Sequence, residues 1–155
     1  MRSLFLTISR FCLTAWVGAA VLFVVTAVAE TMSPEFTSET KSTLAILRFP
    51  FYYAAGFGLV SAALISGLLF GSHWSVGGFR RWIYRFLLVL ALGLMLVDYL
   101  AVYQPLERML SASEEARPAE FETYHRASMY VNAGHVGLCV FASLLICWPG
   151  QRRLD

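Results

Sequence analysis

Charged side chains are scarce in this chain, and their scarcity excludes the usual soluble classes of protein. Only 14% of the residues are charged, whereas 58% are hydrophobic. Soluble domains typically carry about 25% charged residues. The net charge of +2 is also too small to support a nucleic-acid-binding surface. The composition therefore predicts an integral membrane protein, with the lipid bilayer as its main partner and no nucleic acid.

Cysteine is also rare, and no catalytic motif accompanies it. Cys12, Cys139 and Cys147 form no CxxC pair, and their odd number argues against a disulfide framework. We expect them to pack as small apolar side chains. The chain contains no GxSxG nucleophile motif and no internal repeat of the solenoid type. These absences favour a non-enzymatic protein.

Proline is absent from the interior of the long apolar runs. The five prolines stand at the borders of these runs, at Pro34, Pro50, Pro105, Pro118 and Pro149. Many transporters build their binding sites from interrupted helices. The sequence gives no sign of such an interruption.

Four apolar runs are the most informative feature that is present. Each run is about as long as the ~20 residues that a helix needs to cross the hydrocarbon core. A backbone in lipid must satisfy its own polar groups, so each run should be helical. We predict an all-α membrane protein, an antiparallel four-helix transmembrane bundle forming a single domain over residues 1–155. The predicted spans are 12–29, 51–71, 83–103 and 127–148.

The distribution of arginine and lysine predicts the orientation. Seven basic residues flank the two termini and the loop between the second and third runs, whereas five lie in the other two connections. Eight glutamates crowd those other connections. By the positive-inside rule, both termini are cytoplasmic and the acidic connections lie outside. This arrangement suits a multi-pass protein of the plasma (inner) membrane.

The first run has an alternative interpretation. Arg2 and Arg10, the apolar run and then Ala27-Val28-Ala29 also resemble a secretory signal with a small-residue cleavage site. Cleavage there would leave three spans with the same remaining topology.

Local signals predict where two helices begin. Ser33-Pro34-Glu35 has the pattern of a capped helix start, which predicts a short helix in the first outer connection before Pro50 opens the second span. Arg117-Pro118-Ala119-Glu120 predicts that the fourth helix begins about two turns before its span.

The fourth run carries a stripe of polar side chains. Its members fall within about a quarter of the helix circumference, and polar groups in lipid normally face the protein interior. The stripe consists of His125, Ser128, Asn132, His135, Cys139 and Ser143.

Asp98 in the third run is the expected partner of this stripe. Counting ~1.5 Å per residue places Asp98 level with Ser128 to Asn132, and a carboxylate at this depth needs a partner. The candidate partners are Asn132, Ser128, His125, Tyr52 or Tyr53, and Glu30. We therefore predict a polar site that consists of Asp98, His125, Ser128, Asn132 and His135.

This polar site has two interpretations at the level of sequence. The first is a hydrogen-bonded clasp that fixes the register of the helices, and the second is a site for a small ligand, ion or proton open to the outside. Metal and haem are not predicted, because His125 and His135 lie about 15 Å apart along one helix. No cofactor is expected.

The chain resembles the domain-of-unknown-function 4149 family, four-helix membrane proteins similar to transmembrane protein 205. Trp16-Val17-Gly18 resembles the family's tryptophan–glycine pair in span one, and the segment Leu47–Tyr53 resembles its Phe-Pro-x-Tyr motif. The segment Phe121–Asn132 resembles its Phe-x-x-x-His-x-x-Ser-x-x-x-Asn motif, and Gln104-Pro105 fits its proline after span three. The first outer connection departs from the family, because it lacks the proline-aromatic run. The resemblance implies a four-helix membrane bundle without an assigned activity, and it adds weight to His125, Ser128 and Asn132.

The sequence thus favours a non-enzymatic membrane protein with a polar site near the outer surface, formed by spans three and four. Such a protein would act through a protein partner or a small ligand. A small transporter or permeability factor for an ion or solute is the alternative. The sequence leaves the oligomeric state open.

Overall fold

The computed structural model describes residues 2–69, 78–111 and 118–148, and within these ranges the chain is helical and has no strand. The prediction of an all-α fold is therefore confirmed. The elements are α1 (Arg2–Met32), α2 (Ser38–Leu69), α3 (Gly78–Val97), the π-helical turn η2 (Asp98–Tyr103), α4 (Gln104–Leu110) and α5 (Phe121–Cys147).

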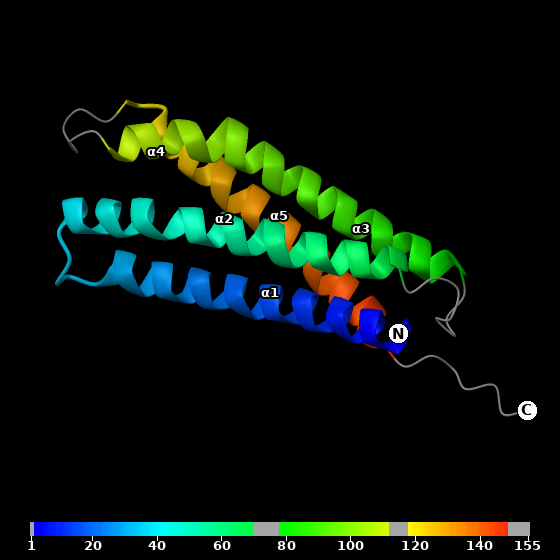
Figure 1. Ribbon diagram of the computed structural model, residues 1–155. Helices are drawn as coiled ribbons and strands as arrows, with labels where there is room; N and C mark the ends of the chain where they lie inside the picture. Colours follow the sequence, from blue (N-terminus) through cyan, green and yellow to red (C-terminus); the bar gives the residue numbers. More distant parts are fainter. Residues whose placement is uncertain (1, 70–77, 112–117, 149–155) are drawn as a thin grey trace, which may run out of the picture.

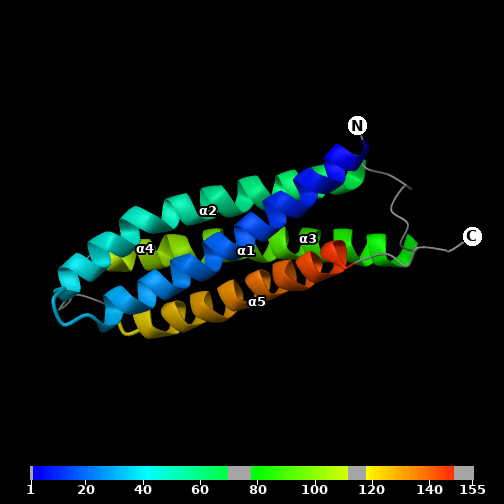
Figure 2. The same ribbon diagram turned by 90° about the horizontal axis from the view of Figure 1, so that it is seen from below.

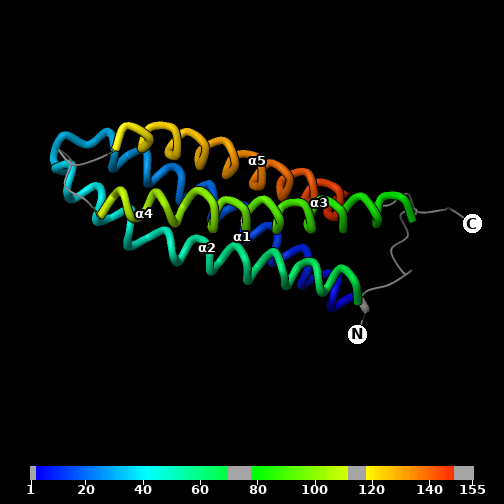
Figure 3. Tube along the Cα trace, turned by 90° about the horizontal axis from the view of Figure 1, so that it is seen from above, coloured from blue at the N-terminus to red at the C-terminus, as the bar shows by residue number. Residues whose placement is uncertain are grey.

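The helices lie lengthwise beside one another in a single elongated bundle (Figure 1). Seen from below, α1 crosses between α2 and α5, while α3 and α4 follow one another along the far side (Figure 2). The tube view shows the same order, with α3 beside α5 (Figure 3). The most extensive contacts join α1 to α2 and α3 to α5. Within the described residues, four helical stretches are long and apolar enough to cross a membrane: Ser3–Met32, Ser38–Leu69, Gly78–Leu110 and Phe121–Cys147.

The second helix begins earlier than the sequence predicts. It starts at Ser38, where the Thr37 hydroxyl accepts a hydrogen bond from the backbone N–H of Thr40 at 3.2 Å. Ser33 caps only a local turn, accepting from the N–H of Glu35 at 3.3 Å. Pro50 does not open the span but lies inside the helix. The prediction failed because one missing backbone donor, at Pro50, is a smaller loss than ending a helix whose neighbours are packed.

The third helix continues beyond its predicted end at Tyr103. Pro105 stands at the start of α4, directly after η2, and the helical path extends to Leu110. In an α-helix the ring of Pro105 would clash with the carbonyl of the fourth residue before it. The wider π turn relieves this clash, and the N–H of Gln104 bonds the carbonyl of Tyr99, five residues back. The start of α5 at Phe121 agrees with its prediction, although Arg117 lies outside the described residues.

The core is built from large side chains packed against small ones. Trp16, Met95 and Tyr84 are fully buried. Gly56 in α2 faces Trp16 and Met95 so closely that an added Cβ would lie 2.3 Å from the Met95 Cε atom. The outward faces are apolar as well: Phe51 is 72% exposed. Apolar side chains both inside and outside are typical of a helix bundle surrounded by lipid.

Candidate functional site

Asp98 is the centre of a hydrogen-bonded network inside the bundle. It is the first residue of η2 and is fully buried. Its Oδ2 atom accepts a hydrogen bond from the Tyr53 hydroxyl at 2.6 Å and another from the Asn132 Nδ2 atom at 2.7 Å. One carboxylate therefore joins three elements of the fold: α2, η2 and α5.

Asn132 extends this network along α5. Its Nδ2 atom also donates to the Ser128 carbonyl at 2.9 Å and lies 3.1 Å from the Ser128 hydroxyl. Its Oδ1 atom lies 3.0 Å from the Nε2 atom of His135. An amide oxygen only accepts hydrogen bonds, so the Nε2 atom of His135 carries the proton. Asn132 thus connects two buried ionisable side chains, Asp98 and His135.

Two polar atoms of the network have no hydrogen-bond partner among the described residues. They are the Oδ1 atom of Asp98 and the Nδ1 atom of His135, and both residues are 0% exposed. Buried polar atoms in folded proteins nearly always have a partner, and an exception calls for an explanation. Because Nε2 carries the proton, Nδ1 presents a lone pair, as the carboxylate Oδ1 does. The network therefore offers two buried positions that can accept a proton.

Aromatic rings surround the network. The Trp16 ring stacks on the His135 ring, with 6.2 Å between their centroids, and it also contacts the Tyr52 ring at 4.9 Å. On the side of Asp98, the Tyr53 ring contacts those of Tyr99 and Tyr103 at 5.1 and 5.0 Å. These contacts keep the surroundings of the two open positions apolar.

Four of the five predicted site residues come together, and one does not. Asp98, Ser128, Asn132 and His135 share the network described above. His125 is exposed, and its ring stacks on Phe121 with centroids 6.0 Å apart. It lies in the first turns of α5, too far along the helix to reach Asp98.

The sequence alone does not decide which tyrosine contacts Asp98 or whether Glu30 joins the site. The sequence offered Tyr52 or Tyr53 without choosing, and it is the Tyr53 hydroxyl that reaches Asp98. Glu30 does not join the site, because it forms an ion pair with Arg48 at 2.6 Å. Trp16, which covers His135, was noted in the sequence only as part of the family resemblance, and its single polar atom gave no signal of this contact.

Two surface hollows lie near the bundle, and neither is lined by Asp98, Asn132 or His135. One, of about 260 Å³, is lined by residues of α1 and α2 that include Trp16, Tyr52 and Arg48. The other, of about 360 Å³, lies at the end of α5 beside Arg80. In the described part of the chain, no three histidine, cysteine or acidic side chains lie close enough together to hold a metal ion.

Comparison with known proteins identifies no relative: no family model, no curated protein and no solved structure matches this chain. The resemblance to the domain-of-unknown-function 4149 family therefore stays a prediction. The class of protein is defined by the fold and the site alone. It is a helical bundle with four stretches long enough to span a membrane and a buried, ionisable hydrogen-bonded network.

Proposed function

We propose that this chain is an integral membrane protein of four antiparallel spans, with both termini in the cytoplasm. The lengths and apolar outer faces of the four helical stretches support insertion in the bilayer. The excess of basic residues around the termini supports the orientation. The plasma (inner) membrane and similarity to the domain-of-unknown-function 4149 family belong to the same proposal.

Within this bundle, we propose that the Asp98 network is a proton-binding site and that the protein is not an enzyme. The observation that carries this proposal is the pair of open, buried acceptors, Oδ1 of Asp98 and Nδ1 of His135. In a clasp that only held helices together, these two atoms would have hydrogen-bond partners or would be replaced by apolar groups. The reason is that an unpaired buried polar atom lowers the stability by about 1–3 kcal/mol.

The chemistry of the site follows from its hydrogen bonds. A proton on the Oδ1 atom of Asp98 neutralises the carboxylate and weakens the bonds that Oδ2 accepts from Tyr53 and Asn132. A proton on the Nδ1 atom of His135 creates an imidazolium and strengthens the bond from Nε2 to Asn132. The two sites titrate as a coupled pair through one amide. Proton binding thereby changes how α2 and α5 are held to η2, which a protein partner or small ligand can sense.

A small transporter for an ion or solute is the alternative function. Transport requires a path from the network to both sides of the membrane. On the cytoplasmic side of His135 the same face of α5 continues into Cys139 and Ala142, both fully buried in the core. Neither of the two hollows described above includes a member of the network. This packing favours a closed binding site over a transport path.

Infrared difference spectroscopy on the protein in lipid nanodiscs tests the proton site. Between about pH 4 and 9, the wild type should show a carboxylic-acid carbonyl band that appears and disappears with pH. The band should be absent in Asp98→Asn and shifted in its titration midpoint in His135→Gln. His125→Gln is the matched control, since it removes an exposed histidine outside the network, and it should titrate as the wild type does. An unchanged band in Asp98→Asn would assign the proton elsewhere and refute the proposal.

A further inference from the structure

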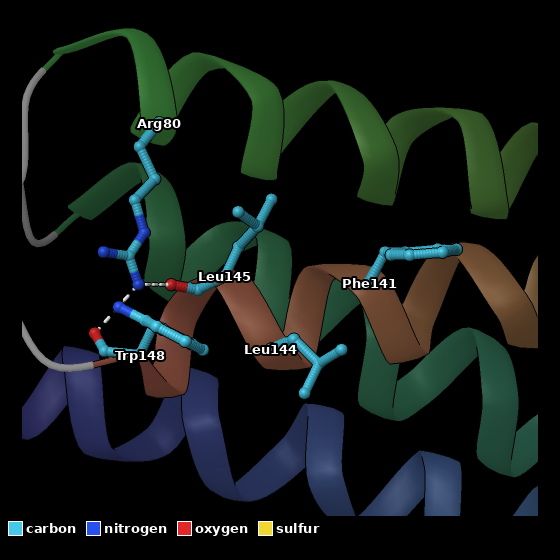
Figure 4. Close-up of a pocket in the computed structure, with 5 residues that line it drawn as sticks. All are labelled: Arg80, Phe141, Leu144, Leu145 and Trp148. Atoms are coloured by element: carbon cyan, nitrogen blue, oxygen red, sulfur yellow. Dashed lines mark hydrogen bonds between the residues drawn. The ribbon is translucent and has the colours of Figure 1, made fainter.

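A groove at the end of the bundle where α1 begins and α5 ends combines an apolar floor with a positive charge. It has a volume of about 360 Å³ and is lined by Arg80, Phe141, Leu144, Leu145 and Trp148. Figure 4 shows Arg80 reaching from α3 to the last turn of α5, with the Phe141 and Leu144 side chains farther along α5. Phe141 and Leu144 are 63% and 56% exposed, so the groove opens to the outside of the bundle.

Two arginines converge on the end of α5. The Nη2 atom of Arg80 donates to the carbonyls of Leu145 and Trp148. The Nε atom of Arg10 donates to the carbonyl of Ile146 at 3.0 Å. A helix C-terminus carries only about half a negative charge. Two guanidinium groups therefore meet at this corner of the bundle.

The acidic side chains lie elsewhere. Among the described residues, each aspartate or glutamate belongs to the other half of the bundle or its connections: Glu30, Glu35, Glu39, Asp98, Glu107, Glu120 and Glu122. Arg81 and Arg85 also belong to the first two turns of α3, and Arg85 donates to the carbonyl of Gly67 at 3.0 Å. Among the described residues, basic side chains therefore predominate at this end of the bundle.

We propose that the groove binds one anionic phospholipid of the cytoplasmic leaflet. Its phosphate lies at Arg80, and one acyl chain follows Phe141 and Leu144 along α5. Trp148 stands at the border between the charged and apolar parts, where tryptophan is enriched in membrane proteins. The position fits a lipid better than a water-soluble anion, because four of the five lining residues are apolar. This inference rests on the membrane insertion proposed above.

The test uses the full-length protein purified in a neutral detergent. Native mass spectrometry and thermal unfolding are recorded with phosphatidylglycerol, with phosphatidylcholine and with inorganic phosphate. We expect one retained phosphatidylglycerol and a higher melting temperature with that lipid alone, since a ligand that binds only the folded state stabilises it. Arg80→Gln should weaken phosphatidylglycerol binding about fivefold. Arg126→Gln removes the same charge at the opposite end, from an exposed ion pair with Glu122, and should bind as the wild type does.

A second variant separates lipid binding from folding, because Arg80 also holds the end of α5. Leu144→Trp keeps Arg80 and its hydrogen bonds but fills the groove, and it should lose the retained lipid while melting normally without lipid. Equal effects of the two lipids, an equal effect of phosphate alone, or wild-type binding by Leu144→Trp would each refute the lipid site. A chain that does not sediment with membranes would refute the proposed function itself, whereas an inserted chain without lipid preference refutes only this inference.

Discussion

Replacing Gly56 by alanine is the sharpest test of the core. The added Cβ would lie 2.3 Å from the Met95 Cε atom and 2.7 and 2.9 Å from the Cη2 and Cζ2 atoms of Trp16. Both neighbours are fully buried. The end of a methionine can move, but the tryptophan ring is rigid and is held against His135. Overpacking of this kind costs about 1–3 kcal/mol.

The net effect must include the helix preference of alanine. Alanine is favoured over glycine inside a helix by about 1 kcal/mol, which offsets part of the clash. We expect Gly56→Ala to lower the free energy of unfolding by up to about 2 kcal/mol, or the melting temperature by up to about 8 °C for a chain of this size. Thermal unfolding in detergent, followed by circular dichroism, measures both.

Gly58→Ala is the matched control for this substitution. It lies on the same helix, but apart from the adjoining helix backbone no atom of the described residues stands within 4 Å of its added Cβ. Its stability should equal or exceed that of the wild type, because only the helix preference acts. Trp16→Phe in the Gly56→Ala background removes both ring carbons that clash, so it should recover part of the loss. Equal stability of the Gly56→Ala and Gly58→Ala variants would show that α1, α2 and α3 do not pack as described.

Three further predictions concern the network and the topology. Asp98→Leu should lower stability by about 1–3 kcal/mol, whereas Asp98→Asn keeps an acceptor and should melt close to the wild type; equal melting of wild type and Asp98→Leu contradicts the network. Asn132→Ala should shift the midpoint of the carboxyl titration at normal membrane abundance, because it removes a donor to Asp98, and His125→Gln should not; a midpoint unchanged by Asn132→Ala would show that Asn132 is not part of the proton site. A topology reporter should be active on the cytoplasmic side when fused after Asp155 and on the outside when placed near Ser113; the reverse result would invert the orientation.

The positions of the helices could be predicted from the sequence, but their ends could not. Hydropathy locates the lipid-facing part of each helix, so each of the four predicted spans coincides with an observed helical stretch. The span 51–71 extends two residues past Leu69, outside the described residues, and the span 127–148 ends one residue after α5. Hydropathy does not show where a helix extends beyond its apolar part. In α2 this extension covers more than three turns before Phe51. Proline misled the prediction at both Pro50 and Pro105, because packing and the π turn accommodate a residue that would end an isolated helix.

The polar site was predicted in part for a related reason. Counting the rise per residue along two neighbouring helices correctly placed Asp98 at the depth of Ser128 and Asn132. Helical periodicity gives the angle of a side chain around the axis but not whether another helix lies opposite it. His125 shares the angle of the stripe and is nevertheless exposed. Glu30 lies at the outer end of its helix, as expected, but it pairs with the nearer Arg48 and not with the site.

The π turn has a consequence for how this chain tolerates changes in length. A π turn accommodates one more residue than the α-helix it interrupts. Deleting a residue within it, such as the exposed Leu100, would restore ordinary winding while leaving the flanking helices in their present rotational phase, provided that Pro105→Ala removes the clash that the π turn now relieves. The same deletion in the middle of α3, at Val89 for example, would rotate everything beyond it by about 100°. It would turn Asp98 away from Asn132. Residues 98–103 are thus the stretch of this span where the loss of a residue should preserve the rotational phase of the helices on either side.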